Sequence, residues 1–384
     1  MKNRILAIIL VFATLFAFAA CTTTGDNNQE YKVAMVTDYG DITDQSFNQA
    51  TYEGCKDWCD ANGISFKYYK PATNSDDDRI ASTKEAIAAG YNVIVMPGYA
   101  FAPTIEATAT LYPDVHFIAL DVALGDLLQA HFPDYDFNPD NAAWSSYTLP
   151  SNVYCAVYQE EIAGFLAGYA AVKEGFTKLG FLGGMSVPAV VRYGYGFVQG
   201  ADLAAKEGSV NISINYVYGG QFFGDNDITA VMDTWYSQGT EVVFACGGGI
   251  FTSAAEAAKK VNGKIIGVDV DQKPTIDGQY GAGMTVTSAM KGLYATVQTC
   301  LNDLIKNGKF ESKIDTLGLV SKTDVEKNYV QLPVGTWSMT KFTVDNYKTL
   351  VGQIFDKTVA VSADIGAHPA VSEFTTVNYQ ADIK

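Results

Sequence analysis

Aspartate or glycine follows nearly every apolar run in this chain of 384 residues. An ionised carboxylate can accept hydrogen bonds from neighbouring hydroxyl groups, and glycine lets backbone amides come close to a ligand. This chemistry suits the non-covalent binding of a small polar molecule. The positions are Asp38, Gly98, Asp121, 183–184, 219–220, 247–249 and Asp269.

The sequence contains no motif that supports a catalytic function. The histidines are His116, His131 and His368, and neither G-x-S-x-G nor H-E-x-x-H occurs. The glycine run at 247–249 lacks the Lys and Ser/Thr of a phosphate-binding P-loop. The acidic runs at 76–78 and 225–227 lack the ligand pattern of a calcium loop and are interpreted as helix caps. We therefore expect no catalytic residue, no metal and no cofactor.

The elements that position these residues alternate between two patterns. Short apolar runs predict strands, and the longer segments between them predict helices. The first strands are expected at 33–37, 65–69, 93–96 and 115–120, with helices at 47–61, 77–89 and 103–111. The later helices are expected at 159–173, 189–205, 228–237 and 253–261, with strands at 178–182, 212–218, 241–245 and 264–268.

This alternation predicts an α/β fold of two doubly wound parallel-sheet lobes, with a hinge and a cleft between them. The chain is also too long for one core. We expect 32–150 and about 288–384 to form one lobe, with a helix at 290–307, and 151–287 to form the other. Residues 123–151 are predicted to be a long loop. Because ligands bind at the carboxyl ends of parallel strands, the aspartates and glycines should face the shared cleft.

The N-terminus predicts export. Lys2 and Arg4 precede an apolar run at 5–20 that is too short for an ordinary membrane span. Residues 1–20 are therefore interpreted as a secretory signal peptide.

The end of that signal resembles the lipobox of bacterial lipoproteins, in which a cysteine after small residues takes a lipid and becomes the new N-terminus. Cys21 is that cysteine, although Phe18 stands where leucine is usual. The polar stretch 21–31 is expected to be a flexible tether. We expect a lipid anchor on the extracytoplasmic face of the cell membrane; an ordinary secreted protein is the alternative.

The composition of the chain limits the kinds of partner that it can bind. Hydrophobic residues make up 48% of the chain, charged residues 18%, and the formal net charge is -16. An acidic chain does not suit nucleic acid or adhesion to anionic lipid, so attachment should depend on the acyl chains. Of the six cysteines, five remain without Cys21, an odd number, and Cys55 and Cys59 have no further zinc ligands near them. We expect the five remaining cysteines to be buried thiols. We also expect the protein to be a monomer.

Several segments resemble the basic membrane protein family. They are VTDYG at 36–40, DQSFNQ at 44–49, LAGYAA at 166–171, GFLGGMSVP at 180–188 and GVDVDQ at 267–272. These lipoproteins are nucleoside-binding components of ABC transporters with a type I periplasmic-binding fold. Three features depart from the family pattern: Tyr193 replaces a phenylalanine, 123–151 is long, and the chain after Lys322 matches poorly.

The resemblance implies a nucleoside ligand, with a purine favoured, delivered to an ABC permease. Phe47 and Tyr193 would stack on the base, and Asp269, with Lys291 beside it, would bind the ribose hydroxyls. The remaining candidates are Asp38, Asn48 and Asp121 for the base edge, Asp44 as a helix cap, and Gly248 for close backbone approach. Core packing for the aromatics, a turn for Asp269 and a solvated Lys291 are the structural alternatives.

Other functions stay open from the sequence. A sugar or autoinducer receptor of the same fold would use similar residues. A nucleoside hydrolase would use an aspartate cluster such as Asp38, Asp41 and Asp44, which is spaced here for a loop and a cap. A signalling lipoprotein that does not transport is a further possibility.

Overall fold

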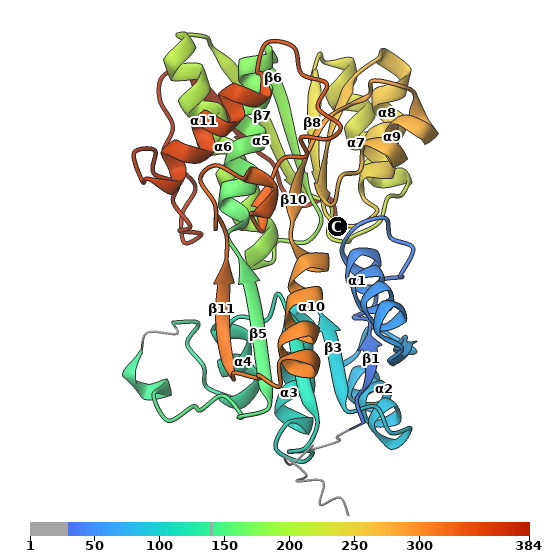
Figure 1. Ribbon diagram of the computed structural model, residues 1–384. Helices are drawn as coiled ribbons and strands as arrows, with labels where there is room; N and C mark the ends of the chain where they lie inside the picture. Colours follow the sequence, from blue (N-terminus) through green and yellow to red (C-terminus); the bar gives the residue numbers. More distant parts are fainter. Residues whose placement is uncertain (1–29, 139–140) are drawn as a thin grey trace, which may run out of the picture. The chain divides into compact units, whose positions relative to one another are not determined.

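Two mainly parallel β-sheets organise the chain in a computed structural model, which describes residues 30–138 and 141–384 (Figure 1). The first sheet has the strand order β11-β5-β4-β3-β1-β2 and, with its helices, forms the first lobe. Its strands are β1 (Lys32–Val36), β2 (Ser65–Tyr69), β3 (Val93–Pro97), β4 (His116–Leu120), β5 (Val153–Tyr158) and β11 (Lys313–Leu317). Its helices are α1 (Phe47–Asn62), α2 (Asp76–Ala88), α3 (Ala102–Thr108), α4 (Leu124–His131) and α10 (Leu293–Leu301).

The second sheet has the order β12-β10-β9-β8-β6-β7-β13, and only the β10–β12 pair among the described strands is antiparallel. Its strands are β6 (Lys178–Gly183), β7 (Ile212–Tyr218), β8 (Val242–Cys246), β9 (Lys264–Asp269), β10 (Thr285–Lys291), β12 (Val330–Gln331) and β13 (Thr375–Tyr379). Its helices are α5 (Glu160–Glu174), α6 (Pro188–Gly208), α7 (Asn226–Ser237), α8 (Phe251–Val261), α9 (Lys273–Tyr280) and α11 (Val344–Phe355). Short helical turns lie at Tyr99–Phe101, Ala142–Trp144, Asn302–Lys306 and Val325–Lys327.

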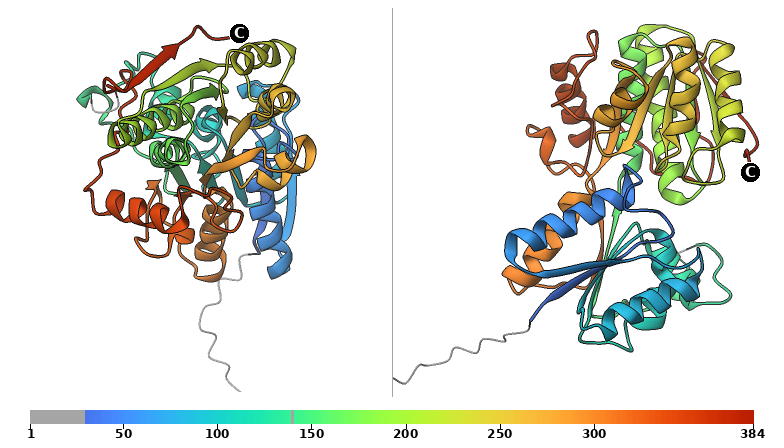
Figure 2. Two further views of the ribbon diagram at one scale, coloured as in Figure 1. Left: turned by 90° about the horizontal axis from the view of Figure 1, so that it is seen from above. Right: turned by 90° about the vertical axis from the view of Figure 1, so that its right-hand side faces the viewer.

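Alternate residues of each strand enter different cores, as the period of two requires. In β1, Val33 and Met35 pack with α1 and α10, whereas Ala34 and Val36 pack with α2 and α3. Figure 2 shows these helix pairs on opposite faces of the first sheet. In the second lobe α5 and α6 cover one face and α7 and α8 the other. Inner strands such as β3 and β8 are buried on both faces, which explains their continuous apolar runs, whereas the edge strands β2, β11 and β13 are partly exposed.

The chain passes between the lobes at three places, visible in Figure 1. β5 leads into α5, β10 leads into α10, and β11 leads back toward β12. Each passage lies near the carboxyl ends of the strands. Any movement of one lobe against the other would therefore bend these three segments.

Glycines set the spacing of α5 and α6, the helices that carry site residues at their N-terminal ends. A Cβ at Gly164 or Gly168 would lie 2.0 or 2.1 Å from a carbonyl oxygen of α6. A Cβ at Gly196 or Gly200 would lie 2.0 Å from a carbonyl oxygen of α5. Only glycine permits this backbone contact, so the two helices hold a fixed register.

The structure corrects four sequence expectations. The predicted loop 123–151 contains α4, whose apolar Leu127 and Leu128 are buried. β5 pairs with β4 in the first sheet, so the first lobe extends past residue 150. The predicted helix at 290–307 begins only at Leu293, because 290–291 end strand β10.

The fourth correction concerns the C-terminal quarter, which was expected to join the first lobe. β11 and α10 do so, but β12, α11 and β13 belong to the second. β13 pairs with the open edge of β7. The apolar side of α11, including Tyr347, Leu350 and Val351, is buried. The pairing of β13 with β7 and the burial of the apolar side of α11 therefore assign these segments to the second lobe.

The predicted signal peptide, Cys21 and nearly all of the predicted tether lie outside the described residues. Within the described ranges, no helix combines the length and apolar character needed to cross a bilayer.

Candidate binding site

A cavity of about 380 Å³ lies between the carboxyl ends of the two sets of strands. Its walls come from both lobes. All nine ligand-binding candidates from the sequence line it: Asp38, Asp44, Phe47, Asn48, Asp121, Tyr193, Gly248, Asp269 and Lys291. Its volume is in the range of sites for single small molecules.

Asp269 is the last residue of β9 and has a left-handed backbone, with φ 64°. It is 5% exposed, and its Oδ2 accepts a hydrogen bond of 2.6 Å from the Ser46 hydroxyl. Burial raises the pKa of Asp269, while the charge of Lys291 and the Ser46 hydroxyl oppose the rise. A non-glycine residue in this conformation is strained, which indicates that the surroundings fix its direction.

Lys291 ends β10 and is the cation of a buried charge network. Its Nζ lies 2.6 Å from Asp121 Oδ2 and 3.2 Å from Glu160 Oε1. Burial alone would lower the pKa of Lys291, but Asp121, Glu160 and Asp269 outweigh it and raise the pKa. The sequence predicts Lys291 beside Asp269. The two side chains attract each other electrostatically, but the direct contacts of Lys291 are with Asp121 and Glu160.

Arg192, the fifth residue of α6, completes this network. Its Nε lies 2.6 Å from Glu160 Oε2, and the Glu160 side chain has 0% exposure. Burial raises the pKa of Asp121 to about 6, against the effect of Lys291. Burial likewise raises the pKa of Asp126, at the cavity wall, to about 6. The cavity is therefore lined by acidic side chains. Two of them, Asp121 and Asp126, take up protons at a higher pH than an ordinary aspartate does.

The start of α1 is held by Asp44, as expected for a capping residue. Its carboxylate accepts from the backbone N–H groups of Ser46, Asn48 and Gln49 at 2.9–3.1 Å. It also accepts from Asn48 Nδ2 at 3.2 Å, and Asn48 Nδ2 in turn lies 3.3 Å from Asp38 Oδ1. Asn48 is thereby oriented by two carboxylates.

Two acceptor atoms in the cavity wall have no hydrogen-bond partner among the described residues. They are Asn48 Oδ1 and Asp121 Oδ1, and both are buried. Both atoms are therefore open to donors from a molecule in the cavity, and pairing with such donors would remove the cost of leaving a buried acceptor unpaired.

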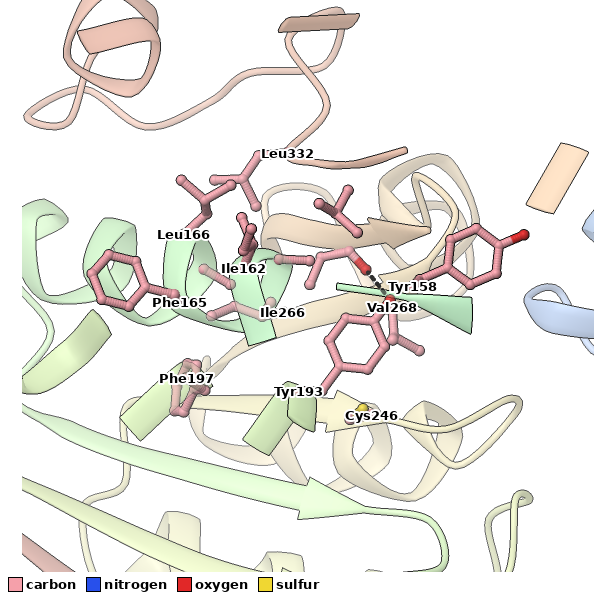
Figure 3. Packing of buried hydrophobic residues seen from close by; sticks show 14 of the residues in the cluster. Tyr158, Ile162, Phe165, Leu166, Tyr193, Phe197, Cys246, Ile266, Val268 and Leu332 are labelled. Atoms are coloured by element: carbon pink, nitrogen blue, oxygen red, sulfur yellow. Dashed lines mark hydrogen bonds between the residues drawn. The ribbon is translucent and has the colours of Figure 1, made fainter. Parts of the chain in front are cut away.

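The two predicted stacking residues lie in different surroundings. Phe47 is partly buried at the wall, with Lys291 Nζ 5.2 Å from its ring centre. Tyr193 is 2% exposed and packs among Phe197, Cys246 and Val268 (Figure 3), while its hydroxyl donates to the Ala289 carbonyl at 3.4 Å. Only a small part of the Tyr193 ring is available to a ligand.

Phe222 is a lining aromatic that the sequence reasoning missed. It follows β7, and its ring lies against Gly184 and Gly247, where added Cβ atoms would come within 2.3 and 2.8 Å. Its ring centre lies 6.3 Å from that of Tyr39, in the other lobe. The glycines therefore make room for an aromatic ring as well as for a ligand. The sequence signal was an aromatic pair, Phe222 and Phe223, that follows a strand, two glycines and Gln221.

Glu160, Arg192, Asp126, Tyr39 and Tyr99 were also not chosen as site residues. All but Glu160 line the cavity, and Glu160 lies behind it. Glu160 and Arg192 begin helices, where the sequence alone suggests ordinary capping or exposure. Their importance follows only from the distance between α5 and α6.

The cations at the cavity already have partners within the described residues. Lys70 lies 2.7 Å from Asp41, while Arg192 and Lys291 hold Glu160 and Asp121. No group of three or more His, Cys, Asp or Glu side chains among the described residues is placed to hold a metal ion. This arrangement suits an uncharged ligand rich in hydrogen-bond donors.

Comparison with known proteins agrees with this geometry. An ABC transporter nucleoside-binding protein, BmpA of Lactococcus lactis, is 28% identical over 335 residues, covering 81% of this chain and 87% of that protein. Basic membrane protein A of Borreliella burgdorferi is 27% identical over 322 residues, covering 83% and 85%.

Solved structures show the same fold. A solute-binding protein of an ABC transporter system from Conexibacter woesei has a TM-score of 0.65 at 21% identity, covering 87% of this chain and 99% of that one. Solute-binding proteins of Aeropyrum pernix give 0.63 at 19% identity, covering 86% and 87%. The family described as ABC transporter substrate-binding protein, PnrA-like, matches residues 31–359. This chain therefore belongs to the Bmp family of ABC transporter substrate-binding proteins.

Proposed function

We propose that this substrate-binding protein is a lipid-anchored extracytoplasmic receptor that captures a nucleoside, preferably a purine nucleoside, and delivers it to an ABC permease. The two lobes close on the solute, which shifts the population toward the closed form. The anchor is the acyl group expected on Cys21, and mass spectrometry of the N-terminal peptide tests it.

The observation that carries this proposal is the meeting of aromatic rings and free acceptors in one cavity. Phe47 and Phe222 supply rings from opposite lobes. Asn48 Oδ1 and Asp121 Oδ1 supply buried acceptors. A nucleoside offers a flat base to the rings and N–H and O–H donors to the acceptors.

Charge argues for a nucleoside over a nucleotide. A phosphate would need a cation, but Arg192 and Lys291 are committed to Glu160 and Asp121. Its negative charge would also meet the carboxylate of Asp269. A neutral sugar would satisfy the acceptors, but it would leave two aromatic rings without a flat partner.

Titration calorimetry with adenosine, guanosine, ribose and galactose tests the proposal. We expect the two purine nucleosides to bind and the monosaccharides to bind far more weakly. Preference for ribose or galactose would instead identify a sugar receptor. Free base appearing after incubation with inosine would identify a hydrolase.

Asp269→Ala should lower nucleoside affinity about tenfold or more, because a charge-assisted hydrogen bond contributes more than the roughly 1.4 kcal/mol that tenfold requires. Asp271→Ala is a matched control, since Asp271 follows the same strand but lies outside the cavity lining. Wild-type affinity in Asp269→Ala would remove this carboxylate from the binding site.

A further inference from the structure

The two lobes touch each other beside the cavity, where the start of α1 meets the loop after β9. In Figure 1 the N-terminal end of α1 points toward the second lobe. Gln45 and Ser46 come from the first lobe, and Asp269 and Gln272 come from the second. These contacts lie outside the ligand-binding roles assigned above.

The first contact joins Ser46 and Asp269. The Ser46 hydroxyl donates to Asp269 Oδ2 at 2.6 Å, and the residues are 0% and 5% exposed. A buried hydrogen bond to a carboxylate is among the stronger neutral-to-charged contacts. It takes one oxygen of the carboxylate and fixes the plane of the group.

The second contact is made by Gln272, which is 1% exposed. Its Oε1 accepts from the Val268 N–H at 2.9 Å, and its own N–H donates to Ser288 Oγ at 3.1 Å. With the side chain so anchored in the second lobe, its Nε2 donates to the Gln45 carbonyl of the first lobe at 3.0 Å.

Backbone conformation points to the same pair of segments. Gln45 has φ 58° and Asp269 has φ 64°, left-handed values that non-glycine residues rarely adopt. One such residue lies on each side of the contact. Strain of this kind persists where surrounding contacts impose it.

We propose that Gln45, Ser46 and Gln272 form an interlobe latch that closes the cleft on this side and that Ser46 is the positioning residue for the Asp269 carboxylate. The role of Asp269 toward a ligand rests on the proposed function, whereas the latch between the lobes does not. Closing of the cleft and alignment of the Asp269 carboxylate then happen together.

Scattering tests the latch without any solute. Ser46→Ala should have a larger radius of gyration than the wild type, because the lobes lose a closing contact. Thr51→Val is the matched control: Thr51 is buried on the same helix, but its hydroxyl donates to the Phe47 carbonyl of α1 and not across the lobes. Equal radii for Ser46→Ala and the wild type would overturn the latch.

Guanosine titrations test the positioning role. Ser46→Ala should weaken guanosine binding about tenfold, and Thr51→Val should not. In the background of Asp269→Ala, which removes the acceptor of the Ser46 hydroxyl, Ser46→Ala should have little further effect, because Ser46 acts through that carboxylate. Full additivity of the two changes would contradict this role.

The pH profile gives a readout that a purely structural serine would not move. Asp269 faces Lys291, Asp44 and Glu160 as well as Ser46, and the Ser46 hydroxyl holds its pKa down. In Ser46→Ala the loss of guanosine affinity on acidification should therefore begin at a higher pH than in the wild type. An unchanged profile would refute the positioning role. If guanosine does not bind the wild type, the proposed function fails, and the scattering comparison still decides the latch.

Discussion

Replacing Glu161 by glutamine should stabilise the protein, and by more at alkaline pH than at acidic pH. Glu161 lies in the first turn of α5, is 4% exposed, and its Oε2 has no hydrogen-bond partner among the described residues. Burial raises the pKa of Glu161 from 4.5 to about 7, with Glu160 adding to the rise and Arg192 opposing it.

The magnitude follows from the difference between the folded and unfolded pKa. Between about pH 4.5 and 7 the folded state binds the proton and the unfolded state does not, so this group lowers stability as pH rises. A rise from 4.5 to about 7, at 1.36 kcal/mol per pH unit, corresponds to roughly 3 kcal/mol once both states are ionised. At pH 5 the same group costs less than about 1 kcal/mol.

Urea unfolding of the wild type and Glu161→Gln at pH 5 and pH 8 measures this directly. The stability gain should grow by about 2 kcal/mol between the two conditions. Other titrating groups are common to both proteins and cancel in the difference. Glu85→Gln, at an exposed position of α2, gives the effect of the same charge change at the surface. A gain that does not change with pH, or a loss at pH 8, would refute the reasoning that burial dominates at Glu161.

Two further changes test the supports of the site. Lys291→Met should destabilise the fold by about 3–5 kcal/mol at pH 7, because it leaves the buried Asp121 and Glu160 without their cation. The loss should be smaller at pH 5, because burial raises the pKa of Asp121 to about 6 and this carboxyl then takes up a proton. An equal loss at both pH values in urea unfolding would argue against charge as the cause. Gly168→Ala should lower the thermal midpoint strongly, since its Cβ would lie 2.1 Å from a carbonyl oxygen of α6. Gly278→Ala is the control, because a Cβ at this position of α9 would meet no other atom, and it should leave the thermal midpoint unchanged or slightly raised. Similar thermal midpoints for the two variants would show that α5 and α6 can separate.

Local patterns were sufficient for much of the fold. The strands expected at 65–69 and 212–218 match β2 and β7 residue for residue, because short segments rich in aromatic and β-branched residues between two helical segments favour strands. The position of Asp38, Asp121 and Asp269 at strand ends was enough to place them at one cavity. Parallel sheets bring those ends together whatever the details of packing.

Features that depend on distant partners escaped prediction. β10 reads TVTSAMK, and its buried Thr285, Thr287 and Ser288 hide the apolar pattern of a strand. Phe222 and Phe223 look alike in sequence and both line the cavity, but only Phe222 packs against Gly184 and Gly247, whereas Phe223 is 58% exposed. Tyr193 was chosen by resemblance, yet its place within α6 buries almost all of its ring.

The last quarter of the chain supplies an edge strand to each of the two sheets. β11 completes the first sheet beside β5, and β13 completes the second beside β7. A chain that is synthesised from its N-terminus must therefore leave the edges of β5 and β7 unpaired until these later segments arrive. Unpaired edges invite intermolecular pairing. The order of the strands thus makes the arrival of β11 the step that covers the open edge of the first lobe, and the later arrival of β13 the step that covers the open edge of the second.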